Sequence, residues 1–346
     1  MANRTLNVGV IGCGRIGHIH AENLATRIPG ARLAATADPA INAAKKVATQ
    51  HHVGKAVADY HELLADPAIE AVAVCSSTDT HAQIIQEAAA AGKHIFCEKP
   101  IDYDLARIRA ALAVVEKAQV KLQIGFNRRF DPSFAKVREL VAAGAVGQPH
   151  VIRITSRDPA PPPLDYIKVS GGIFLDMTIH DFDMVRFLSG SEAEEIYAIG
   201  DALVDPAIRD AGDVDTAIVT MRLKNGALAT IDNSRQAIYG YDQRIEVFGS
   251  KGSASAGNRT PDAHLLTDAA GVHAAKPLHF FLERYAEAYV IEMRAFVDAV
   301  LHDQAPPATG LDGLQPVIMG LAATRSLREG RPVKLSEITA TGTGHS

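Results

Sequence analysis

The sequence predicts an α/β protein in which a doubly wound parallel sheet is followed by an α+β domain with an open, mainly antiparallel sheet. Over the first third of the chain, short apolar runs alternate with stretches of helical periodicity, which is typical of parallel strands joined by crossover helices. After residue 126 the strand-like runs are longer, alternate polar with apolar residues and follow one another with few helices between them. A glycine-rich turn directly follows the first apolar run.

The first domain is predicted at residues 1–126. Its strands are expected at 6–11, 32–37, 71–75, 94–97 and 120–125. Its helices are expected at 15–27, 40–50, 79–91 and 102–119, and Gly92 is a good stop for the third of them. The strand runs are almost wholly apolar because a parallel sheet covered by helices is buried on both faces.

The second domain is predicted at residues 127–338, followed by a tail at 339–346. Its strands are expected at 151–156, 194–203, 215–223, 227–234 and 244–249. Asn225-Gly226 lies between two of these runs and is a strong hairpin signal. Helices are expected at 131–143, 181–188, 281–302 and 314–329, and four prolines make 158–164 a loop.

The composition indicates a globular protein that acts in the cytoplasm. Hydrophobic residues make up 47% and charged residues 22% of the 346 residues, and the formal net charge is −5. Neither a basic face nor a basic amphipathic helix is present, so we expect no nucleic acid and no membrane as partner. The sequence contains no apolar run of about 18 residues, and from its first residues we expect no secretory signal. The three cysteines, Cys13, Cys75 and Cys97, fit neither a disulfide framework nor a metal site, and we expect small buried thiols.

A nucleotide-binding motif stands where the first strand meets the first helix, at Gly12-Cys13-Gly14-Arg15-Ile16-Gly17. In the doubly wound (Rossmann) fold, Gly12 permits the tight turn, Gly14 lets the backbone approach a pyrophosphate and Gly17 lets the helix pack closely. The helix N-terminus adds free N–H groups and a positive dipole end. The alternative is a glycine-rich turn that binds no ligand.

Other residues of this domain indicate which dinucleotide binds. Asp38 follows Gly17 by 21 positions at the end of the second strand. Its carboxylate can accept hydrogen bonds from the ribose hydroxyls and would repel a 2′-phosphate, which favours NAD over NADP. Ser77, Thr78 and His81 follow the strand at 71–75 and are expected to line the cofactor, although His81 could equally belong to the first turn of the next helix.

Asp176 and His180 are spaced four residues apart, so on a helical turn they share one face. A carboxylate beside an imidazole raises its basicity and fixes its orientation, which suits a general base. Two alternatives stay open: an ordinary interaction at a helix start, and a metal site, for which no further His or Cys cluster completes the ligand set, so we expect no metal.

Lys99 stands at the carboxyl end of a predicted parallel strand, between Glu98 and Pro100. Ligands of doubly wound folds bind at that edge of the sheet. The alternative is a solvated surface lysine, which is the commoner role of this residue type.

These motifs together resemble the oxidoreductase family named for glucose–fructose oxidoreductase and inositol dehydrogenase. The resemblance rests on the glycine motif, on Cys97-Glu98-Lys99-Pro100, and on the run from Ser170 to His180, and it covers nearly the whole chain. One departure is Ser170, where many members carry a third glycine. Further segments, at 125–131, 156–159 and 239–244, are most similar to the members that oxidise myo-inositol.

The resemblance implies an NAD-dependent polyol dehydrogenase that oxidises myo-inositol to 2-keto-myo-inositol and forms homotetramers. It implies that Lys99, Asp176 and His180 are catalytic and that Glu98 contacts NAD. It also implies substrate contacts, for each of which a structural role is equally plausible when the residue is taken alone. These are Asn127, Arg128, Asp158 and Tyr239.

Three other functions stay open at this point. The same hydride chemistry could act on another polyol, such as scyllo-inositol or glucose. An NAD-dependent glycosidase would use transient oxidation without net NADH production. A non-catalytic NAD-binding sensor could share the fold, because function lives in sites.

Overall fold

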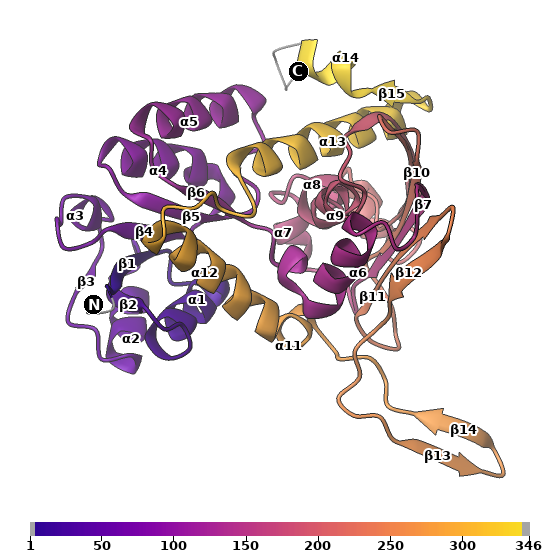
Figure 1. Cartoon of the computed structure of the whole chain (residues 1–346), viewed down its shortest axis with the longest axis horizontal. Helices are drawn as coiled ribbons and strands as arrows, with labels where there is room; N and C mark the ends of the chain where they lie inside the picture. The colour runs from indigo at the N-terminus through magenta and orange to yellow at the C-terminus, as the bar shows by residue number, and fades with distance from the viewer. Residues whose placement is uncertain (1–3, 341–346) are drawn as a thin grey trace. The chain divides into compact units, whose positions relative to one another are not determined.

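The computed structural model describes residues 4–340, which form two compact units (Figure 1). The first unit comprises residues 4–130 and returns at 287–315; the second comprises 131–286 and continues from Pro316. This division differs from the predicted one, in which everything from 127 to 338 was a single domain. The sequence pattern could not reveal the return, because a helix that rejoins an earlier unit has the same periodicity as any other amphipathic helix.

Within residues 4–130, six parallel strands form one sheet in the order β3-β2-β1-β4-β5-β6. This order reverses at β1, which is the arrangement predicted for the doubly wound fold. The two-residue β3 was not predicted, because it is too short to show a pattern. The strands are β1 (Leu6–Ile11), β2 (Ala31–Ala37), β3 (Ala56–Val57), β4 (Ala71–Val74), β5 (His94–Glu98) and β6 (Leu122–Gly125).

Helices cover both faces of this sheet (Figure 1). On one face, α1 (Arg15–Thr26), α2 (Ile41–Gln50) and α12 (Ala286–Leu301) share a buried apolar core with β1. The short α3 (His61–Leu64) lies against β2, and α4 (Thr78–Ala90) packs with α5 (Leu105–Ala118). The contribution of α12 to this core, through Met293 and Phe296 among others, explains why the unit includes residues 287–315.

Seven strands form the sheet of the second unit, in the order β12-β11-β7-β10-β9-β8-β15 among the described residues. All neighbouring pairs are antiparallel except β7 and β10, so the predicted mainly antiparallel sheet is confirmed. The strands are β7 (Pro149–Arg157), β8 (Ala193–Asp201), β9 (Thr216–Leu223), β10 (Leu228–Ser234), β11 (Asp242–Gly249), β12 (Gly252–Ala256) and β15 (Val333–Lys334).

Packing on this second sheet is one-sided. The helices α6 (Pro132–Ala142) and α9 (Ile179–Ser189) lie against it, whereas alternate residues of β9 are exposed on the other face. Within the described residues, none of the helices has the length and apolarity that a membrane span requires. The remaining helices are η1 (Asn127–Phe130), α7 (Leu164–Ile167), α8 (Ile173–Asp176), α10 (Pro206–Asp210), α11 (Phe281–Arg284), α13 (Gly310–Glu329) and α14 (Leu335–Ala340).

The start of α6 shows how buried polar groups define a helix end. Asp131 is the N-cap residue, and its side chain accepts hydrogen bonds from the N–H groups of Ser133 and Phe134. Pro132 occupies the first helical position, where no N–H is needed. The same Asp131 carboxylate pairs with Arg284, and both side chains are 1% exposed. Such a pair is costly to break, because the remaining charge would be buried alone.

Two features at the periphery were not predicted correctly. A hairpin of β13 (Leu265–Asp268) and β14 (Gly271–Ala274) extends away from the second sheet, and all of its strand residues are exposed (Figure 1). The predicted tail begins too early, because Thr339 and Ala340 belong to α14. The rest of that tail, at 341–346, lies outside the described residues.

Candidate active site

The glycine turn lies at the carboxyl edge of the first sheet, between β1 and α1. Gly12 has a φ of +91°, which side-chain-bearing residues rarely adopt, and its N–H donates to the Ala37 carbonyl at 2.8 Å. Gly14 is the N-cap residue of α1, and no side chain among residues 4–340 caps this helix. The first N–H groups of α1, which include those of Arg15 and Ile16, are therefore available to an anion.

The same glycines leave room for a dinucleotide. A β-carbon added to Gly14 would meet no atom within 4 Å, so the backbone is open to a pyrophosphate at this point. A β-carbon on Gly17 would lie 1.9 Å from the Gly12 carbonyl oxygen, so α1 can approach the turn this closely only with glycine there. The residues present thus fit NAD.

Asp38 is held against the glycine turn. Its carboxylate accepts hydrogen bonds from the N–H groups of Cys13 and Ala40, each at 2.8 Å. It therefore fixes the turn and leaves further lone pairs for ribose hydroxyls. Burial, and after it the charge of Asp38, raises the pKa of the Cys13 thiol to about 12. The thiol stays protonated at neutral pH and behaves as a small apolar side chain, as predicted.

Ser77, Thr78 and His81 lie where β4 passes into α4. Ser77 is the N-cap residue and Thr78 the first residue of α4. His81 is 2% exposed, and its ring nitrogens lie 2.8 Å from the Pro100 carbonyl oxygen and 3.0 Å from that of Ser76. His81 therefore belongs to the first turn of the helix and anchors the segment that follows β5.

The ends of β5 and β6 carry the next predicted residues. Glu98 is the last residue of β5, and the half-buried Lys99 follows it. The Glu98 carboxylate is hydrogen-bonded to Nε2 of His20 in α1 at 2.6 Å. Asn127 and Arg128 lie in η1 directly after β6 and are almost fully buried. The first unit thus brings the predicted cofactor residues and Lys99 to one edge of its sheet.

Asp176 and His180 lie in the second unit, at a break between two helices. Asp176 is the last residue of α8 and His180 the second residue of α9, with Met177 and Thr178 in turn conformation between them. The single helical turn predicted from their spacing is therefore interrupted. Among the described residues, the one group of three side chains that could hold a metal ion is elsewhere and includes neither of them.

The Asp176 carboxylate has two partners that were not predicted. It accepts a hydrogen bond from the Tyr166 hydroxyl at 2.8 Å and another from Nη1 of Arg235 at 3.1 Å. Arg235 is only 1% exposed, and its Nη2 lies 3.7 Å from the carboxylate of Asp213. Asp213 in turn accepts a hydrogen bond from the N–H of Ile173 at the start of α8. The buried guanidinium thus connects both ends of α8.

Asn233, two residues before Arg235, holds the other side of the break. Its amide accepts a hydrogen bond from the Thr178 hydroxyl at 2.6 Å and donates one to the Asp181 carboxylate at 2.8 Å. Asn233, Thr178 and Asp181 are all fully buried. The end of β10 therefore locks the segment around His180. The positions of Asn233 and Arg235 at a strand end were the available signal, but polar residues are common there.

Asp158 follows the carboxyl end of β7, and Tyr239 lies in the loop between β10 and the start of β11. The Asp158 N–H donates to the Ser234 carbonyl at 2.9 Å, which places Asp158 beside the end of β10. The Tyr239 hydroxyl donates to Asp242 at 2.6 Å and accepts from Arg157 at 3.2 Å. Burial, and then the bond to Asp242, raises the pKa of Tyr239, so its hydroxyl stays protonated at neutral pH.

The fold and the glycine turn define an NAD-binding oxidoreductase, and comparison with known proteins agrees. Residues 6–126 match the model of an oxidoreductase family with an NAD-binding Rossmann fold, and residues 134–255 match the GFO/IDH/MocA C-terminal domain. The chain belongs to the GFO/IDH/MocA oxidoreductase family, which confirms the resemblance found in the sequence.

Similar proteins match both units together. A myo-inositol 2-dehydrogenase of Thermotoga maritima is 53% identical over 96% of this chain and 99% of its own length. An inositol 2-dehydrogenase of Rhizobium meliloti is 46% identical over 96% of this chain and all of its own length. The crystal structure of a scyllo-inositol dehydrogenase from Lactobacillus casei, with bound NAD(H) and scyllo-inositol, has a TM-score of 0.90, at 32% identity over 96% of this chain and all of that one.

We expect replacement of Gly14 and replacement of Gly17 to have different effects. Gly17→Ala should displace α1 and lower NAD affinity by about tenfold or more, with a fall in Tm, because the new methyl group meets backbone. Gly14→Ala should keep the Tm of the wild type and lower only the affinity, because it fills space left for the pyrophosphate. Calorimetric titration with NAD and thermal melts check both. Wild-type affinity in either variant would contradict the predicted cradle.

We expect Arg235→Met to destabilise the second unit strongly, since the carboxylates of Asp176 and Asp213 would lose this buried cation. Removing one partner of a buried pair costs about 3–5 kcal/mol, which predicts a fall in Tm of at least about 6 °C. The control is Lys136→Met, which breaks an exposed pair with Glu139 on α6 of the same unit and should change Tm little. Equal, small shifts in the two variants would show that Arg235 does not hold α8.

Proposed function

We propose that this protein is an inositol 2-dehydrogenase, which oxidises myo-inositol to 2-keto-myo-inositol and transfers the hydride to NAD. The observation that carries the proposal is that one chain contains both a glycine turn open to NAD and an Asp176–His180 segment held in place by buried side chains. That chain matches inositol 2-dehydrogenases over 96% of its length. The reaction belongs to inositol catabolism, and the free, buried cysteines Cys13 and Cys97 suit the reducing cytoplasm.

Each of the three catalytic residues has a separate role. His180 removes the proton of the reacting hydroxyl as general base. Lys99 donates a hydrogen bond to the same oxygen and stabilises the negative charge that develops there. Arg235 and Tyr166 hold the Asp176 carboxylate in place before the helix that carries His180. There it accepts a hydrogen bond from a neighbouring substrate hydroxyl. When bound, NAD supplies the hydride acceptor.

The remaining predicted residues bind cofactor and substrate. A polyol presents many hydroxyl groups, and a site that leaves them unpaired loses several kcal/mol of binding. We assign Asn127, Arg128, Asp158 and Tyr239 to these hydroxyls; the Tyr239 hydroxyl donates its hydrogen to Asp242 and offers its remaining lone pair as an acceptor. The cofactor residues are Gly12, Gly14, Arg15, Ile16, Gly17, Asp38, Ser77, Thr78, His81 and Glu98.

A panel of polyols tests the function directly. Purified protein with NAD is mixed with myo-inositol, scyllo-inositol, chiro-inositol, glucose or xylose, and NADH absorbance is followed. We expect the fastest reduction with myo-inositol. If another polyol leads, the substrate assignment is wrong and the reaction class stands. No reduction with any polyol, despite NAD binding, would favour a glycosidase or a sensor.

The matched variant for this panel is Lys99→Ala. We expect kcat to fall by about 10²- to 10⁴-fold with unchanged NAD affinity, because the lysine acts on developing charge. Near-normal turnover would remove Lys99 from the chemistry.

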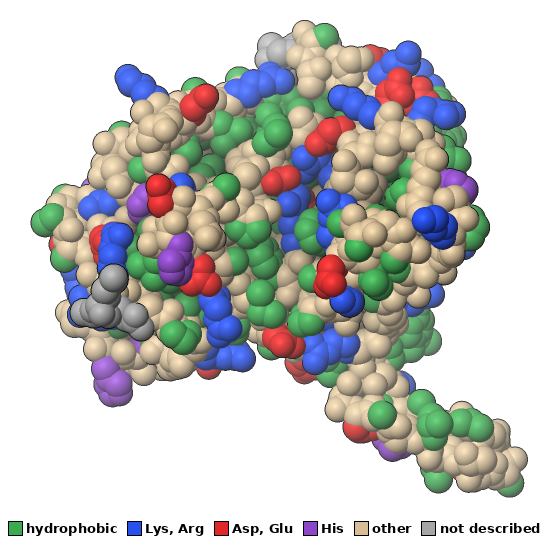
Figure 2. All heavy atoms as spheres, viewed as in Figure 1, with side chains coloured by type: hydrophobic (Ala, Val, Ile, Leu, Met, Phe, Trp, Pro, Cys, Tyr) green, Lys and Arg blue, Asp and Glu red, His purple; other side chains and the backbone are tan. Residues whose placement is uncertain are grey.

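We further propose that the protein forms a homotetramer through the open face of the second sheet. Ile218, Leu228 and Phe248 are 38–48% exposed there, and a second copy would cover them. The projecting hairpin also exposes Leu265, Leu266 and Val272, and Figure 2 shows hydrophobic side chains along it.

Light scattering should give the mass of four chains, and Ile218→Asp should lower it, because a charge on the covered face is costly to bury. Leu311→Asp, at an exposed apolar site in the first unit, is the control. A monomeric wild type would contradict the assignment.

A further inference from the structure

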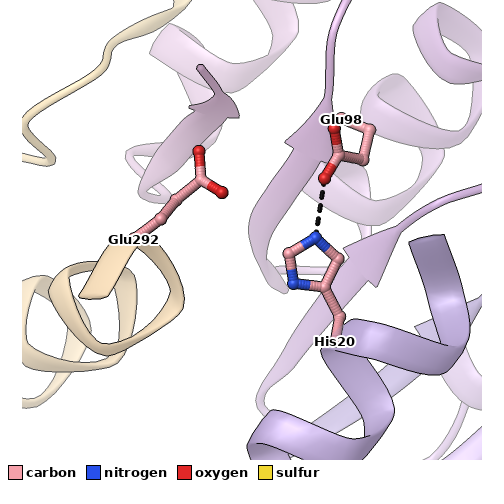
Figure 3. A group of neighbouring side chains, drawn as sticks. All are labelled: His20, Glu98 and Glu292. Atoms are coloured by element: carbon pink, nitrogen blue, oxygen red, sulfur yellow. Dashed lines mark hydrogen bonds and ion pairs between the residues drawn. The ribbon is translucent and has the colours of Figure 1, made fainter. Parts of the chain in front are cut away.

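A buried polar cluster lies in the first unit, beneath the end of β5. It consists of His20 from α1, Glu98 from β5 and Glu292 from α12, and Figure 3 shows the three side chains facing one another from separate elements. One ligand-type atom of each lies within 4.8 Å of the others. His20 and Glu292 are fully buried, and the Glu98 side chain is 14% exposed.

The distance between His20 and Glu98 fits a direct hydrogen bond better than two ligands of one metal ion. Their nitrogen and oxygen are 2.6 Å apart, which is a strong hydrogen bond. Two ligand atoms on one tetrahedral zinc ion, each about 2.1 Å from the metal, would lie about 3.4 Å apart. Aromatic rings enclose the imidazole, with the centroid of Phe96 at 4.8 Å and that of Tyr289 at 5.8 Å. In such an apolar setting, a polar pair persists only if its bond is made.

The surroundings of Glu98 are shaped to hold its carboxylate in one place. On the side away from His20, a β-carbon at Gly125 would come within 2.9 Å of Glu98 Oε2. The carboxylate therefore packs against the bare backbone of β6, and a larger residue there would displace it. His20 and Gly125 together fix the Glu98 side chain and, with it, the orientation of the peptide that leads to Lys99.

The residues before and after Lys99 are thus each held by a buried histidine. Glu98 before it is tied to α1 through His20, and Pro100 after it is tied to α4 through Nδ1 of His81 at 2.8 Å. The helix that carries His20 also presents the glycine turn. A long, flexible lysine side chain can act on a substrate oxygen only if its backbone is held, and a misplacement of about 1 Å can cost about 100-fold in rate.

We propose that His20 is a positioning residue for the dehydrogenase reaction: by donating its Nε2 hydrogen to Glu98, it fixes Lys99 relative to the helix that receives NAD. The inference rests on the proposed function of Lys99. The proposal requires a hydrogen-bond donor at Nε2 of His20 and not at Nδ1, and two amide substitutions distinguish these two positions. Glutamine can place an N–H near the Nε2 position, whereas asparagine reaches only the Nδ1 position.

The test compares His20→Gln, His20→Asn and the control His18→Asn on the same helix. We expect His20→Asn to lower kcat by about 10- to 100-fold with the KM for NAD changed less than about threefold. His20→Gln should regain most of this loss, and His18→Asn should behave as the wild type. Equal kcat in His20→Asn and wild type, or no recovery in His20→Gln although it folds as judged by its thermal melt, would overturn the proposal.

A substrate-free measurement keeps the inference testable if these variants misfold or if the wild type oxidises no polyol. In wild-type protein labelled with ¹⁵N-histidine, we expect His20 Nε2 to carry a proton at neutral pH, with a resonance that shifts in Glu98→Gln. An unprotonated Nε2, or stoichiometric zinc or manganese that is lost in His20→Asn, would overturn the inference. If no polyol is oxidised but Nε2 of His20 is protonated and bonded to Glu98, the result would count against the proposed function and not against the role of His20.

Discussion

The close approach of α1 to the glycine turn is the constraint on which the first unit depends. Only the missing side chain of Gly17 lets this helix lie against the Gly12 carbonyl. That position aims the first N–H groups of α1 at the carboxyl edge of the sheet, where Asp38 is bonded to the Cys13 N–H of the same turn. It also brings the second turn of α1 beside β5. A single steric requirement thus serves anion binding, ribose recognition and the contact with Glu98.

The second unit achieves comparable order by different means. Its candidate residues stand at a break between α8 and α9, where helical hydrogen bonding alone does not fix the backbone. Buried side chains of β10 supply the missing constraints, through the amide of Asn233 and the guanidinium of Arg235. Polar groups this deeply buried strongly favour the one arrangement that satisfies them, so they specify geometry more than they add stability.

The sequence predicted most elements because they depend on local patterns. The strand at 6–11, the glycine turn and the helix after it are read from apolar runs and glycine spacing, and the structure has them at the same place. The break between Asp176 and His180 could not be read, since a spacing of four is compatible with a continuous helix. Arg235 and Asn233 were missed for another reason: their partners Asp176 and Asp181 lie more than 50 residues away, and only the folded chain brings them together.

The return of α12 to the first unit affects how this chain can fold during synthesis. The apolar side chains of Val290, Met293, Phe296 and Val297 complete the core under β1, yet they follow more than 150 residues of the second unit. The nucleotide-binding half therefore remains without one wall of its core until the ribosome has made nearly the whole chain. During that time the apolar surface that α12 covers beside α1 and α2 is exposed, which invites association with chaperones or with other nascent chains. An excised N-terminal fragment would carry the same exposed face permanently, so the nucleotide-binding half is not a transferable module.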